Sequence, residues 1–410
     1  MPHSSAAAHA HIEAPKDCTG CALCANVCSH QAISMVWSQE GFLIPHVDED
    51  ACTHCGVCVR MCPALRPAPP SEKLKDCRVE AYGAWHRSSE VHRSSSSGGI
   101  FTALAEQTIA RGGCVFGVIW QDKLHAVFTK AETLDELAAM RGSKYTMAIP
   151  GAVYQEVRRE LKKGRRVLFA GTPCQVHALR TLLRRPNENL LTLDVVCHGV
   201  PSRLLLERYI EEAEASEGKS VQYVDFRDKR SSWLNYSQTC WFSDGSRLSH
   251  LLHEDAYMSL FLSDVLLNRC CYHCRYSHFP RQGDITLGDF WGVQELHPDW
   301  PIREGISAVL VNSERGNRAL SSLNASVELR PVSPDEIIRF KPQSYMASSS
   351  LIPGARRQVL RELPRKPLAD LVQRYTGGKW LGPIFIPAGS LLGRMLRRLR
   401  RRLNQLRHLR

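Results

Sequence analysis

The sequence predicts an α/β protein with a small α+β module at its N-terminus. From residue 79 onward, short apolar runs typical of strands alternate with helical patterns. Ahead of them, eight cysteines fall into two copies of one spacing. The 410 residues are 43% hydrophobic and 23% charged, which excludes a largely disordered or collagen-like chain and favours two or three globular domains.

The N-terminal cysteines repeat with the spacing C-x2-C-x2-C-x3-C. One copy holds Cys18, Cys21, Cys24 and Cys28; the other holds Cys52, Cys55, Cys58 and Cys62. Three thiolates on a tight loop wrap one face of an iron–sulfur cube, and the fourth ligand comes from the other copy. We therefore expect Cys62 to complete the first cluster and Cys28 the second. Zinc sites or disulfides are the alternatives. The segment resembles bacterial-type two-cluster ferredoxins, and its apolar pieces at 33–37 and 42–47 predict a hairpin.

Strands and helices of the larger body follow from apolar periodicity. We expect strands at 79–86, 114–120, 166–170, 190–196, 221–226, 284–288 and 306–311, and helices at 100–110, 172–183 and 202–214. No G-x-G-x-x-G follows a strand, so a Rossmann dinucleotide site is not predicted.

The positive charge is concentrated at the C-terminus. The net charge is +12, but residues 391–410 hold eight Arg and no acid, which leaves little basis for nucleic-acid binding by the body. Leucines at helical spacing in this segment predict a basic amphipathic helix. It would dock on an anionic membrane surface or a partner protein, or extend into solvent.

The expected location is the cytoplasm, with peripheral attachment to the inner face of the membrane through the C-terminal helix as an extension. No apolar run approaches the roughly 18 residues of a membrane span, and the first residues lack a secretory pattern. In that compartment, sixteen cysteines indicate metal ligation or redox chemistry rather than disulfides.

Two loops of the body have the composition of ligand-binding loops. Ser97, Gly98 and Gly99 precede the helix at residue 100, where free N–H groups and the helix dipole suit a phosphate. An ordinary Ser N-cap on a flexible connection is the alternative. Ser143, Lys144 and Tyr145 follow a glycine and would bind an anion and a ring, unless they form only a solvated loop.

Four further cysteines are expected at one edge of the sheet. Thr172 and Pro173 are a natural helix start, which places Cys174 at the positive helix end as a nucleophile, redox thiol, metal ligand or buried side chain. Cys197 follows another strand. With Cys271 and Cys274, these thiols would hold another cluster, or zinc.

Eight motifs, in order, resemble one family. They are SSSSGGIFTALA, RGSKY, VLFAGTPCQVHALR, CHGVPS, FRDKRSSW, CYHCRY, DITLGDFWG and GISAVLVNSERG. Together they are similar to the beta-subunit family of coenzyme F420 hydrogenase/dehydrogenase, over roughly residues 77–345. The family includes plant hydroxymethyl-chlorophyll reductases and bacterial proteins from polysaccharide loci.

The resemblance implies a flavin, usually FAD, and assigns residues to it. The FAD phosphates would be contacted by Ser97, Gly98 and Gly99, and the flavin would lie beside Ser143, Lys144 and Tyr145. The pocket would be completed by Thr172, Pro173 and Lys229. The third 4Fe–4S cluster would be held by Cys174, Cys197, Cys271 and Cys274. Lys144 and His198 are the candidate catalytic residues, His198 as a proton donor or in a structural role. Where many relatives have Val-Gln-Ser after the Ser-Lys-Tyr motif, this chain has Thr146, Met147 and Ala148.

These expectations give five regions and one activity. The regions are a two-cluster ferredoxin domain (1–66), a linker (67–78), a flavin-binding region (79–165), a C-terminal family domain with the third cluster (166–350) and an extension (351–410). The resemblance implies an oxidoreductase that passes electrons from a ferredoxin-like one-electron donor through clusters and FAD to a small-molecule acceptor. Coenzyme F420 or an organic substrate, such as one of polysaccharide metabolism, would be the acceptor. An electron-transfer subunit with the active site elsewhere, or a redox sensor, is the alternative.

Overall fold

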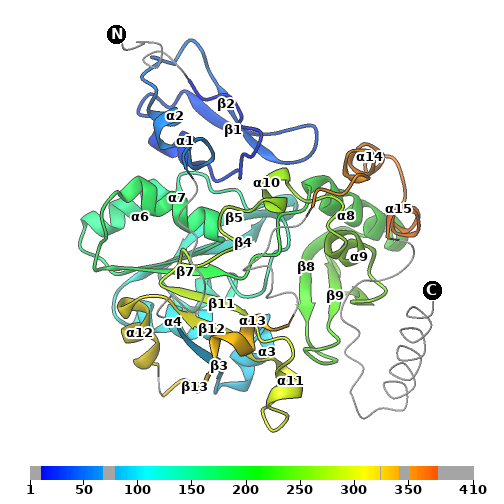
Figure 1. Ribbon diagram of the computed structural model, residues 1–410. Helices are drawn as coiled ribbons and strands as arrows, with labels where there is room; N and C mark the ends of the chain where they lie inside the picture. The colour runs from blue at the N-terminus through cyan, green and yellow to red at the C-terminus, as the bar shows by residue number, and fades with distance from the viewer. Residues whose placement is uncertain (1–10, 68–78, 324, 341–350, 377–410) are drawn as a thin grey trace, which may run out of the picture.

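A computed structural model describes residues 11–67, 79–323, 325–340 and 351–376 (Figure 1). It confirms the α/β class: a small cysteine-rich module sits on a larger body with a mixed eight-stranded sheet and a separate three-stranded sheet. Most of the expected linker and the whole basic segment at 391–410 lie outside the described residues.

The N-terminal module is built around a hairpin between two short helices. Its elements are α1 (Leu23–Val27), β1 (Ile33–Trp37), β2 (Leu43–Val47), α2 (Val57–Met61) and a 3-10 turn (Pro63–Leu65). The strands β1 and β2 pair antiparallel, as the sequence predicts.

The large sheet places several strand ends at one edge. Its strands are β3 (Glu80–His86), β4 (Cys114–Gln121), β5 (His125–Ala131), β6 (Val167–Gly171), β7 (Leu190–Val195), β11 (Ile285–Asp289), β12 (Ser307–Val311) and β13 (Val327–Val332). The order is β13-β3-β12-β11-β7-β6-β4-β5. The central strands β4, β6, β7 and β11 run parallel, so their carboxyl ends share an edge, while the outer strands are antiparallel.

Helices cover both faces of this sheet. The helices associated with it are α3 (Ser89–Ser94), α4 (Ile100–Ala110), α5 (Leu134–Ala138), α6 (Val153–Lys162), α7 (Pro173–Leu183), α12 (Glu314–Ser321) and α13 (Pro334–Ile338). One apolar cluster joins α4 and α12 to the sheet. A second joins α6 and α7 to the sheet and includes Leu23 and Met61 of the N-terminal module, so the module extends the core of the body.

The three-stranded sheet packs within a helical layer. It consists of β8 (Val221–Asp228), β9 (Ser237–Phe242) and β10 (Arg247–Leu251), in antiparallel pairs. Helix α8 (Arg203–Glu217) and the 3-10 turn at Asp122–Leu124 contact β8; α9 (Ala256–Leu262) packs on α8, α15 (Leu368–Tyr375) on α9, and α14 (Arg356–Glu362) on α15. The remaining short elements are α10 (Arg269–Tyr272), α11 (Val293–Leu296) and a 3-10 turn at Ile302–Glu304. Among these elements are the fully buried rings of Trp233, Tyr257 and Phe261.

Polar contacts fix the N-terminal module on the body. The Ser202 hydroxyl donates to the Glu40 carbonyl at 2.6 Å, and Arg356 pairs with the Glu40 carboxylate at 2.9 Å. The Asn26 amide donates to the Gly151 carbonyl at 2.8 Å. These bonds and the shared apolar core set the position of the cysteine loops relative to the sheet edge.

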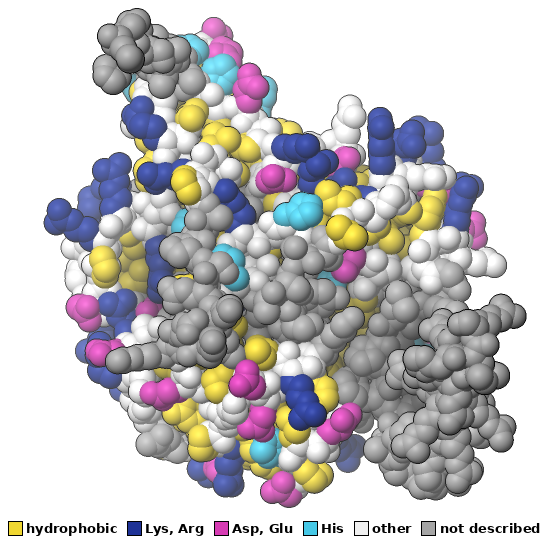
Figure 2. Space-filling model, in the orientation of Figure 1, with side chains coloured by type: hydrophobic (Ala, Val, Ile, Leu, Met, Phe, Trp, Pro, Cys, Tyr) yellow, Lys and Arg dark blue, Asp and Glu magenta, His cyan; other side chains and the backbone are white. Residues whose placement is uncertain are grey.

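The surface in Figure 2 shows Lys and Arg side chains interspersed with acidic ones, in keeping with the modest charge expected of the body. Within the described ranges, none of the helices is both long enough and apolar enough to cross a membrane.

Candidate iron–sulfur centres and adjoining cavity

Four thiols gather where the first cysteine loop meets the end of the second motif. We call Cys18, Cys21, Cys24 and Cys62 site I. The first three lie in the loop leading into α1 and in α1 itself, and Cys62 follows α2. Burial, followed by the negative charge of neighbouring cysteines in this set, raises the pKa values of Cys18 and Cys24. Buried thiolates that repel one another favour a bound cationic centre, and soft thiolate ligands suit iron–sulfur clusters.

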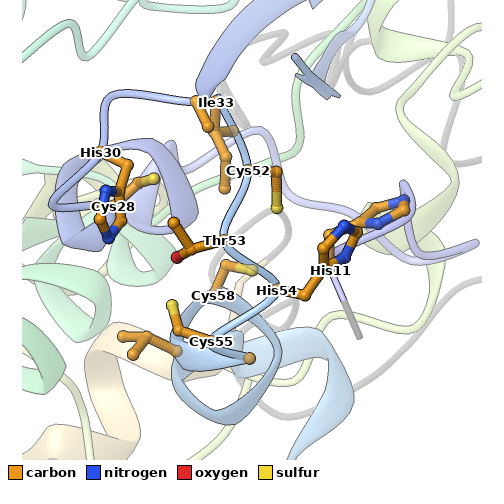
Figure 3. Close-up of a pocket in the computed structure, with 12 residues that line it drawn as sticks. His11, Cys28, His30, Ile33, Cys52, Thr53, His54, Cys55 and Cys58 are labelled. Atoms are coloured by element: carbon orange, nitrogen blue, oxygen red, sulfur yellow. The ribbon is translucent and has the colours of Figure 1, made fainter. Parts of the chain in front are cut away.

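The other four motif cysteines surround a small hollow at the far end of the module. We call Cys28, Cys52, Cys55 and Cys58 site II. All four line this hollow, together with His11, His30 and His54 (Figure 3). Cys55 is exposed, so site II lies close to solvent. The structure therefore brings together the two exchanged sets that the spacing predicts.

The third set of thiols assembles at the carboxyl edge of the large sheet. Cys174 is the second residue of α7, which follows β6, and Cys197 follows β7; Cys271 lies in α10 and Cys274 just after it. Burial and the charge of Cys271 and Cys274 raise the pKa of Cys197 to about 12. The Val200 N–H donates to the Cys271 sulfur at 3.4 Å. The chemistry of this set also fits a cubane cluster. Cys270, to which the sequence gives no role, is a further, half-buried thiol beside Cys271.

Site I and the third set are neighbours across the module boundary. Helix α1 packs against α6 and α7. Cys21 of site I is one of the charges that raise the pKa of Cys174 after the dominant effect of burial. The three cysteine sets therefore lie in the order site II near solvent, site I at the module boundary, and the third set at the edge of the large sheet.

A cavity of about 430 Å³ opens beside the third set. Its walls come from the serine loop before α4, the 141–148 segment, the ends of β6, β7 and β11, and the three-stranded sheet. Thr19 and Gly20 of the site I loop also line it, so the N-terminal module supplies part of the wall. Of the predicted residues, the lining includes Ser97, Gly99, Ser143, Lys144, Tyr145, Thr172, Cys174, Cys197 and His198.

The serine loop is fixed by its own hydroxyl groups. Gly99 is the N-cap of α4 with a φ of 87°, a conformation that favours glycine. The Ser143 N–H donates to the Ser96 hydroxyl at 2.7 Å, which ties the two predicted loops together. The Ser97 hydroxyl donates to the Ile306 carbonyl at 2.9 Å.

Lys144 combines a cavity position with a capping role. Its ammonium donates to the carbonyls of residues 139–142 just after α5, at 3.0 to 3.2 Å. Burial lowers the pKa of Lys144 to about 7. The charge state of the Lys144 amine therefore depends on the polarity and charge of a ligand bound in the cavity.

Arg227 and Asp289 form the polar centre of the opposite wall. Both line the cavity, and their guanidinium and carboxylate groups are joined by bonds of 2.7 and 3.0 Å. Arg227 also donates to the Tyr145 hydroxyl at 3.1 Å, and the Trp233 indole donates to Asp289 at 2.9 Å. The motifs FRDKRSSW and DITLGDFWG contain these two residues, but the sequence alone assigns neither of them a role.

His198 lies between the third thiol set and the cavity. Its Nε2 is 2.8 Å from the Asp264 carboxylate, and its ring packs edge-on against Phe261 at 4.8 Å. An imidazole and a carboxylate therefore lie next to each other beside the cavity.

Three of the residues predicted for the flavin pocket do not line the cavity. The Gly98 N–H donates to the Ser307 hydroxyl, and a Cβ at Gly98 would approach the Ala84 carbonyl oxygen to 2.1 Å, so Gly98 is required for close packing. Pro173 is the first residue of α7. The Lys229 ammonium donates to the carbonyls of His92 and Ser97 at 2.9 Å, which supports the serine loop from behind.

Comparison with known families agrees with this arrangement. Residues 81–153 and 164–335 match the N- and C-terminal parts of the coenzyme F420 hydrogenase/dehydrogenase beta subunit, and residues 17–65 match a 4Fe–4S dicluster domain. The chain belongs to the coenzyme F420 hydrogenase/dehydrogenase beta-subunit family. It is an iron–sulfur protein of an oxidoreductase family, with a 4Fe–4S dicluster domain that contains sites I and II.

The proteins similar to this beta-subunit family member include two sequences and one solved structure. One subunit of the F(420)H(2) dehydrogenase of Methanosarcina mazei is 22% identical over 323 residues, covering 76% of this chain and 84% of the relative. The chloroplastic 7-hydroxymethyl chlorophyll a reductase of Oryza sativa subsp. japonica is 25% identical over 213 residues, covering 51% of this chain and 42% of the relative. A chain of the F420-reducing NiFe hydrogenase complex of Methanosarcina barkeri aligns with a TM-score of 0.45 at 18% identity, over 72% of this chain and 92% of that chain.

Proposed function

We propose that this protein is a flavin-dependent iron–sulfur oxidoreductase that exchanges electrons between a ferredoxin-like one-electron donor and a small-molecule acceptor. The main observation in support of the proposal is that site I, the third set of cysteines and the cavity lie next to one another. Cys174 and Cys197 of the third set line the cavity, and Cys21 of site I neighbours Cys174. Clusters at these sites would supply one-electron steps, and FAD in the cavity would supply hydride chemistry.

The cavity residues would each contribute to holding FAD. The serine loop and the amino end of α4 would face its phosphates, with Ser97 and Gly99 in the wall. Ser143, Lys144 and Tyr145 would lie beside the ring system, where the charge of Lys144 would favour an electron-rich flavin. The volume of about 430 Å³ lies within the range of cofactor and small-ligand sites.

His198 would hold a proton at the boundary between the third set and the cavity. The Asp264 carboxylate lies 2.8 Å from its Nε2, and the ring lines the cavity. In this proposal the acceptor is coenzyme F420 or an organic substrate, and the protein acts in the cytoplasm, where thiolates remain reduced.

A second candidate is an electron-transfer subunit whose acceptor site lies on another polypeptide. It is favoured by the archaeal relative that is named as one subunit of a dehydrogenase. A partner protein would then cover the cavity mouth or the solvent side of site II.

Anaerobic purification with counts of iron, acid-labile sulfide and flavin tests the proposal. About twelve irons and one FAD per chain are expected, since each 4Fe–4S cube brings four irons. About eight irons with FAD would show that the third set of cysteines binds no cluster. About eight irons without flavin, even after reconstitution, would contradict the proposal of a flavin-dependent enzyme. Reoxidation of the dithionite-reduced flavin by added acceptors at catalytic rates separates an enzyme from an electron carrier.

A further inference from the structure

Tyr154, in the first turn of α6, is fully buried where the N-terminal module meets the body. Its ring packs against Phe169 of β6 at 6.0 Å, in the apolar cluster that also contains Leu23 of α1. The Tyr154 hydroxyl oxygen is buried and has no hydrogen-bond partner among the described residues. Leaving such a buried group without a hydrogen bond is unfavourable, so a bound partner is expected at this point.

The surroundings of the hydroxyl identify the chemistry of that partner. Cys21, Cys174 and Cys24 are all electrostatic neighbours of the phenol. Two belong to site I and one to the third set, so the side chain stands at the junction between two cluster sites. A phenol carries its proton at neutral pH, so the unpartnered hydroxyl acts as a hydrogen-bond donor.

We propose that the Tyr154 hydroxyl donates a hydrogen bond to a sulfur atom at the junction of site I and the third set, and thereby raises the reduction potential there. The inference rests on the proposed function, because it requires bound clusters. A donor to sulfur stabilises the reduced, more negatively charged state of a cluster. Tyr154 is thus a positioning and tuning residue: it exchanges neither electron nor proton.

The test is Tyr154→Phe, which keeps the ring and removes only the hydroxyl. Iron and sulfide are counted first, and potentials are then followed by anaerobic redox titration with electron paramagnetic resonance. We expect unchanged iron content and a more negative midpoint potential for one cluster signal. Tyr209→Phe is the control, because the buried Tyr209 hydroxyl already has a partner, the Asp255 carboxylate at 2.7 Å; its cluster potentials should match those of the parent protein.

A second readout uses the parent protein and needs no variant to fold. After exchange into D2O, electron–nuclear double resonance of the reduced protein should show a strongly coupled exchangeable deuteron, and Tyr154→Phe should lack it. Unchanged potentials together with an unchanged deuteron signal would overturn the inference. A parent protein with only eight irons would refute the third cluster instead, and the site I signal would still decide the role of Tyr154, since Cys21 and Cys24 belong to site I.

Discussion

The Arg227 guanidinium and the Asp289 carboxylate form a two-pronged ion pair in the cavity wall, with N–O distances of 2.7 and 3.0 Å. The Arg227 side chain is 2% exposed, and its guanidinium lies 4.0 Å from the centre of the Tyr236 ring. The pair joins β8 of the small sheet to β11 of the large sheet. It therefore holds the two halves of the cavity wall together.

Asp289→Asn should destabilise the protein strongly, because it leaves the Arg227 charge buried without its counter-ion. We expect the free energy of unfolding to fall by about 3–5 kcal/mol, measured by thermal denaturation, and the amount of flavin bound per chain to fall as well. Glu328→Gln is the matched control: it breaks the pair with Arg87, whose side chain is 56% exposed, and should change stability by less than about 1 kcal/mol. Equal losses in the two variants would contradict a special role for the buried pair.

The sequence predicts the central strands better than the edges. Apolar runs indicate β4, β6, β7, β11 and β12 because these strands are buried on both faces. The edge strand β13 was not predicted; Arg330 and Pro331 are typical of a strand that borders solvent and therefore weaken its apolar signal.

The same contrast holds for the candidate site. Spacing alone predicts that Cys28 and Cys62 exchange between clusters, and parallel topology predicts that Cys174 and Cys197 meet. Arg227 and Asp289 carry no such signal, because they come from different sheets and only tertiary packing pairs them. The contribution of Thr19 and Gly20 to the cavity wall likewise depends on how the module docks, which local periodicity does not encode.

Cys274→Ser should remove one cluster and leave the other two. Because its thiol belongs to the third set, we expect iron to fall from about twelve to about eight per chain, measured by metal and sulfide analysis with electron paramagnetic resonance. The control is Cys114→Ser, since Cys114 is a buried packing residue of β4. Full iron content in Cys274→Ser would assign the ligand elsewhere, with the neighbouring Cys270 the first residue to examine.

Stability should fall as pH rises from 5 to 7 because of Asp255. This carboxylate caps α9 and accepts bonds from Met258 N–H and the Tyr209 hydroxyl. Burial raises the pKa of Asp255 from 3.8 to about 6. The folded chain therefore binds the proton more tightly than the unfolded chain, and the stabilising effect is lost as the carboxyl ionises, by about 1 kcal/mol over this range.

Asp255→Asn provides the reference for that measurement, since the amide does not titrate. Melting temperatures of the two proteins, recorded at matched iron content between pH 5 and 7, should diverge with pH, with the parent protein losing stability relative to the variant. Parallel curves would show that Asp255 ionises without coupling to folding.

The contact between Gly20 and Met147 should couple the N-terminal module to the cavity wall. Gly20 has a φ of +67°, and a Cβ there would lie 2.7 Å from the Met147 terminal methyl carbon. Gly20→Ala therefore combines backbone strain of about 1–2 kcal/mol with overpacking against Met147. Gly112 has a φ of +73° and nothing within 4 Å of its Cβ position. Gly112→Ala therefore introduces the backbone strain without any steric overlap and serves as the control.

A double-mutant cycle separates the two effects. In the Met147→Ala background, the destabilisation by Gly20→Ala should shrink by about 1 kcal/mol because the crowded methyl group is gone. The destabilisation by Gly112→Ala should be the same in both backgrounds. Denaturant unfolding of protein with full iron content measures each term. Additive values for Gly20 and Met147 would mean that the loop moves away from Met147 without strain, and that Met147 does not fix the module against the cavity wall.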